Sequence, residues 1–371
     1  MKIAAIGDAH LGRSYYPYTT AEGVNQRERD FEISFEAAVD LALAQSPDAV
    51  IWLGDVFDHP RPTFRSFRIA QRALAKIRDH GITAVIISGN HDTPRLPGTG
   101  SPYSPLADTF PEFHFAHRLA YERFELPGLL VHAVPQMLTV DATKEALAEV
   151  DNSRSLDRTN LLLTHPRVPQ VEPKYADINE IEVDAGLLRA DLVLLGHYHS
   201  HRKVLPGIWY AGATDTFSFA DDPDPKGIVV LDTDTGVCTH VPLEGQRPMV
   251  TPEPIHALGL SPDEIQAALI DRVAAAPADA VVRLYVDGVA PEAWRLVDHE
   301  VVREAGAHLL HAQIERTNAP AAGQVDAGDD FGNLADLWAR WLPQQDLIGF
   351  DRDRIRDMGD DYLARAQEQA S

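Results

Sequence analysis

The side chains best suited to chemistry in this chain are aspartates, histidines and one asparagine that cluster in five short motifs. Each motif follows an apolar run. The motifs are Gly7-Asp8-Ala9-His10, Gly54-Asp55-Val56-Phe57-Asp58, Gly89-Asn90-His91-Asp92, Thr164-His165 and Gly196-His197-Tyr198-His199. Carboxylate oxygen, amide oxygen and imidazole nitrogen suit hard divalent ions such as Mn²⁺, and no motif contains a thiolate. The pattern predicts a centre of two metal ions that acts on phosphate esters.

Two ions about 3.5 to 4 Å apart need one carboxylate between them and separate ligands on each side. We assign Asp55 as the bridging carboxylate. The first ion would be bound by Asp8, His10 and His199. The second would be bound by Asn90, His165 and His197. His91 is then free to protonate the leaving oxygen. Asp58, one turn beyond Asp55, is expected to hold the His91 imidazole in position.

The apolar runs before the motifs are short, branched and uninterrupted, as in strands that are buried on both faces. They span residues 3–6, 49–53, 84–87, 161–163 and 192–195. In a mainly parallel sheet the carboxyl ends of such strands lie on one edge, where open α/β folds bind their ligands. The sequence therefore predicts an α/β fold with the five motifs gathered at one sheet edge.

The five motifs, in this order, resemble the signature of the calcineurin-like metallophosphoesterase superfamily: D-x-H, G-D-x-x-D, G-N-H-D/E, a lone His and G-H-x-H. The stretch Gly7-Asp8-Ala9-His10-Leu11-Gly12 and the basic segment after Asp58 are further similar to SbcD-type subunits of bacterial DNA repair nucleases, relatives of the meiotic recombination eleven nuclease. The resemblance implies a four-layer β-sandwich flanked by helices. It also implies the same metal ligands, His91 as the catalytic histidine, two Mn²⁺ ions and a metal-bridging hydroxide that hydrolyses DNA phosphodiesters, by exonuclease or endonuclease cleavage.

We divide the chain into a nuclease domain (1–248), a small α/β cap (249–318), a flexible linker (319–332) rich in Ala, Gly and Asp, and a helical tail (333–371). The cap is expected to contain a helix over 261–275 with Ser261 as N-cap, a strand over 280–286, a helix over 291–305 and a strand over 308–314. By resemblance it would select DNA ends. The alternative is a stabilising appendage without substrate contact.

Two amphipathic helices are predicted in the tail, with Leu337, Trp338 and Trp341 on one apolar stripe and Tyr362 on the other. Their apolar faces must either fold back on the domain or dock on another chain. The resemblance favours docking on the coiled coil of an SbcC-like ATPase. The chain has no Gly-x-x-x-x-Gly-Lys-Ser/Thr loop, so an ATP-driven step would have to come from such a partner.

Composition favours a soluble cytoplasmic protein. The chain has 371 residues, a single cysteine at Cys238, no signal-peptide pattern and no apolar stretch of membrane-spanning length. Its net charge of −23 is unusual for a DNA-binding protein. Two divalent ions would nevertheless make the centre locally positive.

One basic stripe stands out against this acidity: Arg61, Arg65, Arg68 and Arg72 at helical spacing, followed by Lys76. It is either a solvated helix face or a contact to DNA phosphates or a second subunit. By resemblance, the helices beside it would form a homodimer.

The sequence also departs from the resembled pattern. Where SbcD-type proteins tend to have a serine and a basic residue, this chain has Tyr210-Ala211-Gly212-Ala213-Thr214-Asp215 and so lacks that hydroxyl and that charge. Two other functions therefore stay open. One is a phosphodiesterase or phosphatase for small molecules, such as cyclic nucleotides, and the other is a non-catalytic interaction scaffold.

Overall fold

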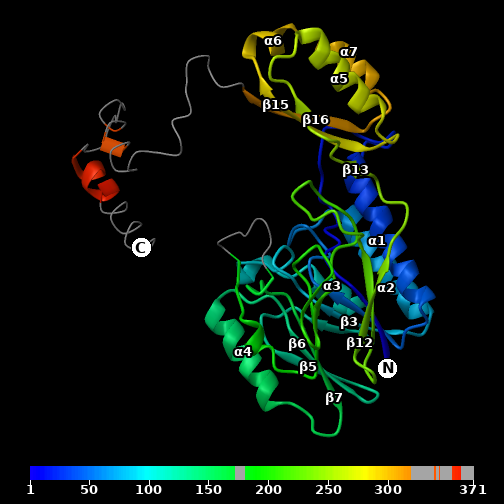
Figure 1. The fold of residues 1–371 in the computed structure, drawn as a ribbon. Coiled ribbons are helices and arrows are strands. Elements are labelled where there is room, and N and C mark those ends of the chain that lie inside the picture. The colour runs from blue at the N-terminus through cyan, green and yellow to red at the C-terminus, as the bar shows by residue number, and fades with distance from the viewer. Residues whose placement is uncertain (172–179, 319–337, 340–341, 343–352, 361–371) are drawn as a thin grey trace.

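Two six-stranded sheets pack face to face in the first part of the chain (Figure 1). The computed structural model describes residues 1–171, 180–318, 338–339, 342 and 353–360. The first sheet has the order β12 (Val237–Pro242), β11 (Gly227–Asp232), β1 (Lys2–Ile6), β2 (Ala49–Leu53), β3 (Thr83–Ile87) and β4 (His114–Ala116). The second has the order β5 (Glu122–Leu126), β6 (Leu129–Val134), β7 (Thr159–Thr164), β8 (Leu192–Leu195), β10 (Ile208–Tyr210) and β9 (Arg202–Leu205).

Helices cover the outer face of each sheet. The helices α1 (Gln26–Ala44), α2 (Phe64–Asp79) and α3 (Tyr103–Thr109) pack on the first sheet, and α4 (Val140–Asn152) packs on the second. Alternate residues of a strand enter different cores, because side chains along a strand point to opposite faces. Ile51 lies between the sheets, whereas its neighbour Trp52 packs under α1 against Phe35. The expected four-layer α/β architecture is confirmed.

The motif-bearing strands belong to both sheets, which corrects the expectation of a single sheet edge. The strands β1, β2, β3 and β4 run parallel in the first sheet, while β6, β7, β8 and β10 run parallel in the second. Three motifs thus follow strands of one sheet and two follow strands of the other. An uninterrupted apolar run shows that a strand is buried on both faces but not which sheet contains it.

A separate small sheet lies beyond the end of α1 and forms the cap (Figure 1). Its strand β15 (Val281–Val289) pairs in parallel with β16 (His311–Asn318) and with the short strands β13 (Met249–Val250) and β14 (Ile255–His256). Three helices cover one face of it: α5 (Pro262–Ala274), α6 (Pro291–Leu296) and α7 (His299–Ala305). The division of the chain at 248/249 stays a prediction.

Local signals in the cap are partly realised. Ser261 caps α5 through a capping box with Glu264, as its position before the helix predicts. The single helix expected over 291–305 is wrong, because Val297 adopts an extended backbone and the Asp298 side chain accepts hydrogen bonds from the amides that begin α7. A strong N-cap inside a helical pattern therefore starts a second helix.

The tail is described only at residues 338–339, 342 and 353–360, the last of which are helical. Within these residues the Trp338 ring lies directly against Gly359, so that a Cβ there would collide with the indole. Leu337, Trp341, Tyr362 and the whole linker lie outside the described residues. Among the described helices, none has the length and apolar character needed to cross a lipid bilayer.

Candidate metal centre

Each of the five motifs begins where its strand ends, and the loops meet at one end of the sandwich. Four motif residues adopt a left-handed backbone: Asp8 (φ 42°), His10 (φ 47°), Asp55 (φ 49°) and His197 (φ 99°). Such conformations cost free energy for residues with a Cβ and gather at functional sites. They turn the chain sharply after β1, β2 and β8, which brings side chains from distant loops toward one centre.

Glycines allow these loops to approach each other closely. Gly54 has φ +89°, and a Cβ there would lie 2.5 Å from His165 Nδ1 and 2.7 Å from the Gly89 amide nitrogen. At Gly196, an added Cβ would collide with Leu53 O. The glycines of the motifs are thus required by the contact between the two sheets' loops.

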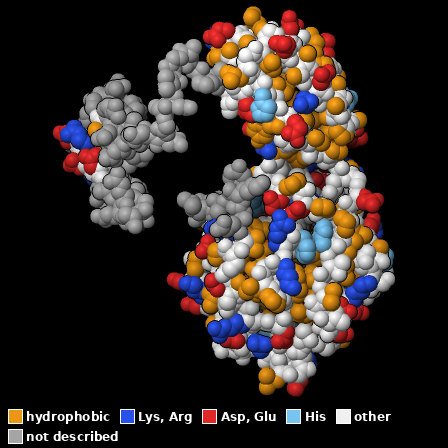
Figure 2. Space-filling model, viewed as in Figure 1, with side chains coloured by type: hydrophobic (Ala, Val, Ile, Leu, Met, Phe, Trp, Pro, Cys, Tyr) orange, Lys and Arg blue, Asp and Glu red, His pale blue; other side chains and the backbone are white. Residues whose placement is uncertain are grey.

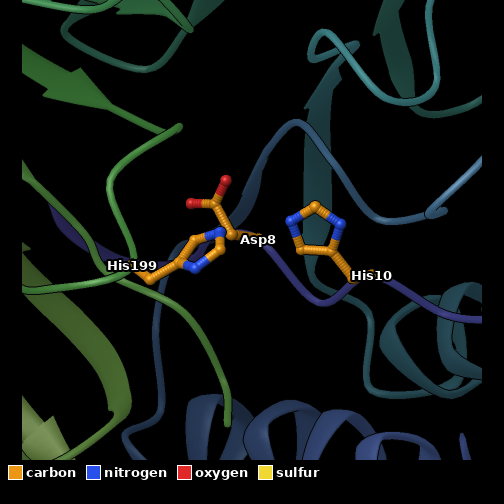
Figure 3. Close-up of side chains that lie close together, drawn as sticks. All are labelled: Asp8, His10 and His199. Atoms are coloured by element: carbon orange, nitrogen blue, oxygen red, sulfur yellow. The ribbon is translucent and has the colours of Figure 1, made fainter. Parts of the chain in front are cut away.

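The carboxylates and imidazoles converge in three overlapping groups: Asp8, His10 and His199; Asp8, Asp55 and His165; and His10, Asp55 and His91, each with ligand atoms within 4.8 Å of one another. Figure 3 shows the first of these groups, in which Asp8 and His10 come from the loop after β1 and His199 comes from the loop after β8. Asp55 Oδ2 lies 3.2 Å from His165 Nε2 and 3.8 Å from His10 Nε2. It thus stands between one histidine of each predicted ion set, where a bridging ligand belongs.

The second predicted set is completed by Asn90 and His197. Asn90 Oδ1 faces His197 Nδ1 at 3.1 Å, and the backbone amide of His197 donates to Asp8 Oδ1 (3.0 Å). All seven predicted ligands therefore lie at one end of the sandwich. Their division between two ions stays a prediction.

Each of the four histidines predicted to bind metal has one ring nitrogen held by a protein acceptor. His10 Nδ1 donates to Asp58 Oδ1 (3.0 Å), and His165 Nδ1 donates to Leu53 O (2.6 Å). His199 Nδ1 and His197 Nε2 are held in the same way, by Asp221 Oδ1 (2.8 Å) and Glu180 Oε2 (3.0 Å). Such partners fix the tautomer and ring orientation of histidines that bind metals.

The opposite ring nitrogens face the centre. Nε2 of His10 and of His165 are buried without a hydrogen-bond partner among the described residues. A buried polar atom without a partner costs free energy, which a cation at the centre would remove. The arrangement of lone pairs and carboxylates therefore fits divalent metal ions.

The charges at the centre are mutually dependent. Burial lowers the pKa of His165, but the Asp55 carboxylate outweighs burial and raises that pKa to about 10. Burial lowers the pKa of His10 to about 4, so this imidazole is neutral at physiological pH. In the metal-free protein a proton on His165 thus supplies positive charge to Asp55, and metal binding would release it.

His91 is placed beside this centre as predicted. Its Nδ1 donates to Asp58 O (3.2 Å) and lies 3.5 Å from Asp58 Oδ1, and its backbone amide donates to Asp55 Oδ1 (2.8 Å). Burial lowers the pKa of His91, but the hydrogen bond to Asp58 and the charge of Asp55 raise it to about 9. Asp58 therefore contacts both His91 and the ligand His10.

Asp92 connects two motif loops, a function that the sequence did not suggest. Its Oδ1 accepts from the Gly89 amide (2.7 Å), its Oδ2 accepts from the Val56 amide (2.9 Å), and the buried Tyr103 hydroxyl donates to Oδ2. Burial raises the pKa of Asp92 to about 7. This side chain holds the Asp55 loop and the Asn90 loop at a fixed separation.

The predicted DNA-contacting stripe lies on α2 and in the turn before it, and it is largely paired within the chain. Arg65 forms a two-pronged ion pair with the fully buried Glu32 of α1, through Nε and Nη2. Arg72 pairs with Glu36 (3.0 Å), and Lys76 pairs with Asp40. These contacts hold α1 and α2 together, and a role of Arg65, Arg68 and Arg72 in DNA binding stays a prediction.

Arginines also line the hollows beside the centre. Three adjoining hollows share Asn90 and His91 in their walls. Their linings include Arg13, Arg61, Arg95, Arg167 and Arg202. Figure 2 shows no continuous basic area on the face in view, where Lys and Arg alternate with acidic side chains. Of the stripe, Arg61 alone lines one of these three hollows.

The departure at 213–215 has a structural explanation. Asp215 is fully buried, and its carboxylate accepts from Ser34 Oγ (2.6 Å) and faces Arg27 Nη2 (3.5 Å). Both partners belong to α1, which thus supplies a hydroxyl and a positive charge beside the segment that lacks them. Arg27 also donates to Thr216 O (2.6 Å).

Sequence reasoning missed Asp221 and Glu180, the carboxylates that hold His199 and His197. Asp221 belongs to the acidic run Asp221-Asp222-Pro223-Asp224, which is typical of a solvated loop. Glu180 follows a polar stretch with no motif. The only available signal is indirect, because a histidine that binds metal needs an acceptor for its second nitrogen.

Comparison with known proteins agrees with this geometry. A sequence model described as calcineurin-like phosphoesterase matches residues 1–201. The chain is similar to proteins named "DNA double-strand break repair protein Mre11" in three archaea. The Thermoplasma acidophilum protein is 28% identical over 261 residues (66% of this chain and 66% of that protein). The Saccharolobus solfataricus protein is 29% identical over 206 residues (55% and 51%), and the Methanocaldococcus jannaschii protein is 35% identical over 108 residues (29% and 28%). The aligned regions thus span less than two thirds of these relatives.

Proposed function

Because this chain belongs to the calcineurin-like phosphoesterase family, we propose that it is a metal-dependent phosphodiesterase that cleaves DNA in double-strand break repair. The names of its relatives support DNA as the substrate. Two divalent ions, with Mn²⁺ as the first choice, would be held by the seven ligands described above. Mg²⁺ or another hard divalent ion suits the same oxygen and imidazole ligands.

The observation that carries this proposal is the orientation of His10, His165 and His199. Each gives one ring nitrogen to a protein acceptor and turns the other toward Asp8 or Asp55. His197, by contrast, has both ring nitrogens paired, with Glu180 and with Asn90. Three imidazoles thus present one ring nitrogen to a centre that also holds two carboxylates.

A residue of the chain would then donate the proton that the departing alcohol oxygen needs. When bound, two divalent ions supply a nucleophile at neutral pH by lowering the pKa of water and stabilise charge on the phosphoryl oxygens. His91 has its Nδ1 turned to Asp58, so Nε2 is available to the substrate. A protonated imidazole at this position can donate to the departing alcohol oxygen. Asp58 favours that protonated form and fixes the ring.

A polyanionic substrate has to be reconciled with the net charge of −23 and with the acidic partners of Arg13, Arg167 and Arg202. Two bound divalent ions would add positive charge at the centre. Exposed charges are screened beyond about 8 Å at physiological salt, so distant acidic residues act weakly at the centre. The five arginines in the walls of the three hollows lie next to His91 and the metal ligands. We propose that these arginines, with Arg61 the member of the predicted stripe, contact DNA phosphates.

The decisive experiment is digestion of end-labelled linear, hairpin and single-stranded DNA across a Mn²⁺ titration, beside cyclic nucleotides and a phosphopeptide. Wild-type protein should cleave DNA, whereas His91→Ala should abolish turnover. His256→Ala is the matched control, because His256 is an exposed cap histidine far along the chain from every motif. Turnover of the small substrates alone would replace this proposal by the small-molecule phosphodiesterase, and no turnover of any substrate with bound metal would favour the scaffold.

The partner proposals rest on the resemblance of the tail and of the helices beside the basic stripe. We propose that residues 333–371 dock on an SbcC-like ATPase, that the chain forms a homodimer, and that it acts in the cytoplasm. Deleting 333–371 should abolish co-purification with a co-encoded ATPase and leave cleavage of single strands intact. Unchanged co-purification would remove the docking proposal. Light scattering of the full chain tests the dimer.

A further inference from the structure

The loop Phe217–Asp222 connects the cap to the metal ligand His199. Asp221 lies near its end, and the Asp221 Oδ2 accepts hydrogen bonds from the amides of Phe217 (2.7 Å) and Ser218 (3.2 Å). The other carboxylate oxygen, Oδ1, accepts from His199 Nδ1 (2.8 Å). One side chain thus closes the loop on itself and orients a metal ligand. Any displacement of the loop would turn the imidazole.

The same loop also supports a second ligand of the first predicted ion. The buried Phe217 ring lies edge to face against both His10 and His199, with ring centroids 4.9 Å apart in each case. Lys226, which is nearly fully buried, donates from Nζ to His199 O (2.9 Å) and to Asp222 O (3.2 Å). The loop therefore packs on His10 and His199 of the first predicted set, and none of these contacts involves Asn90, His165 or His197.

The cap touches this loop through one arginine. Arg283 lies on β15, on the face of the cap sheet opposite the buried Val282 and Leu284. Its guanidinium lies 4.5 Å from the centre of the Phe219 ring, and Nη2 donates to Phe219 O (3.4 Å). The Tyr285 ring, 5.1 Å away, lies against the same guanidinium.

Other contacts between the cap region and the nuclease domain avoid the loop. His311 of β16 stacks on Tyr16 with ring centroids 4.3 Å apart, and Arg247, which pairs with Asp30 of α1, donates from Nη1 to Asp279 O of the cap (2.6 Å). These contacts hold the cap in place without touching Phe219 or Asp221. They offer a control that separates loss of cap attachment from loss of the loop contact.

We propose that the cap positions the metal ligand His199 through Arg283, the Phe217–Asp222 loop and Asp221, so that cap contact sets the affinity of one of the two metal ions. Arg283 and Asp221 are positioning residues in this scheme. The affected ion is the one held by Asp8, His10 and His199. This inference rests on the two-metal centre of the proposed function and adds that the two ions respond differently to the cap.

The test measures Mn²⁺ binding to the full-length metal-free chain by calorimetry, with electron paramagnetic resonance to distinguish a coupled ion pair from a single ion. Asp221→Asn should weaken one site by about tenfold to a hundredfold, as for other residues that orient metal ligands. Arg283→Ala should weaken the same site by about threefold to tenfold, as expected of coupling through an intermediate loop. Arg283→Lys should be intermediate, because it keeps the charge and loses the flat stacking surface.

His311→Ala is the matched control and should leave both sites unchanged. Arg283→Ala should also have little further effect in the Asp221→Asn background, since both act through one imidazole. If Arg283→Ala does not fold, Phe219→Leu removes the ring under the guanidinium and should weaken the same site.

Three results would overturn the inference: wild-type affinities in Arg283→Ala, equal weakening of both sites, or an equal effect of His311→Ala. A wild-type protein that binds no Mn²⁺ would instead reject the proposed function itself.

Discussion

Replacing Asp58 by asparagine is expected to lower the pKa of His91 in the metal-free protein from about 9 toward its ordinary value of 6.5. Burial by itself lowers that pKa, and the side-chain hydrogen bond and charge of Asp58 oppose burial together with the charge of Asp55, which the variant keeps. Asparagine keeps the shape of Asp58 but removes the charge. Titration of the imidazole Cε1 protons by nuclear magnetic resonance measures the pKa directly, with His91→Gln identifying the resonance.

The magnitude follows from the same pKa. A rise from 6.5 to about 9 corresponds to about 3 kcal/mol in favour of the charged imidazole, which Asp58 and Asp55 supply together and which is an upper limit for Asp58 alone. Because the His91 side chain is 39% exposed, solvent screening reduces this contribution to about 1 to 2 kcal/mol. The folded-state pKa lies above the unfolded one, so this stability is fully present below 6.5 and is lost as the pH rises through about 9.

Urea unfolding of metal-free Asp58→Asn should therefore show a larger loss of stability just below pH 6.5 than above pH 9. His10, also bonded to Asp58, is neutral across this range with a pKa of about 4, so its contribution cancels in the difference. In the His91→Gln background the pH dependence of the loss should disappear. The reasoning is refuted if the loss in the wild-type background is the same at both pH values.

Three further changes test other parts of the structure. His91→Ala should retain both Mn²⁺ ions and lose turnover, whereas Asp55→Ala should lose bound metal as well. Calorimetry measures the bound metal in both variants. Equal metal loss in the two would show that the role of His91 is misassigned. Arg247→Ala should lower the free energy of unfolding by about 2 kcal/mol at neutral pH, because it removes a hydrogen-bonded partner from the buried Asp30 carboxylate. Burial raises the pKa of Asp30, and the hydrogen bonds and charges of Arg247, Gln26 and Arg27 together outweigh burial and lower it. The stability from the Arg247 pair is therefore present above the ordinary value of 3.8 and lost as the pH falls through the lower folded-state value; a difference between the two proteins that persists in strong acid would contradict this. Gly54→Ala should cost about 2 kcal/mol or more in thermal unfolding, because φ is +89° and the new Cβ would enter a ligand imidazole; a wild-type melting temperature would contradict this.

The convergence of the seven predicted ligands was foreseeable from the sequence because each motif follows its own strand closely. A buried strand and the turn after it are encoded within about ten residues, and parallel strands place their carboxyl ends together. The same locality explains Ser261, whose capping box with Glu264 lies within four residues. Features that depend on residues close together in the sequence can be predicted without knowing the tertiary fold.

Long-range partners were not predictable in the same way. Asp221 orients His199 from 22 residues away, and its acidic neighbours conceal it in a pattern typical of solvated loops. Asp92 stands inside a recognised motif, but its function depends on Tyr103 and the Val56 amide, which only the fold brings to it.

The basic stripe shows a signal that was present and overlooked. Glu32, Glu36 and Asp40 have a spacing of four on α1, which complements the cations of α2. Two helical stripes of opposite charge in consecutive helices indicate a helix pair as readily as a contact to nucleic acid. Reading both helices together favours the pairing that the structure contains.

The distribution of ligands over both sheets has a consequence for folding. The loops after β1, β2 and β3 supply one part of the centre, and the loops after β7 and β8 supply the other. Bound ions would therefore link the two sheets at this end of the sandwich. Any ion that binds only the native state adds to its stability, by about 2.7 kcal/mol when its free concentration is a hundred times its dissociation constant. The concentration of available Mn²⁺ would then affect the stability of the folded protein as well as its activity. Melting temperatures measured across a Mn²⁺ titration would show this stabilisation directly.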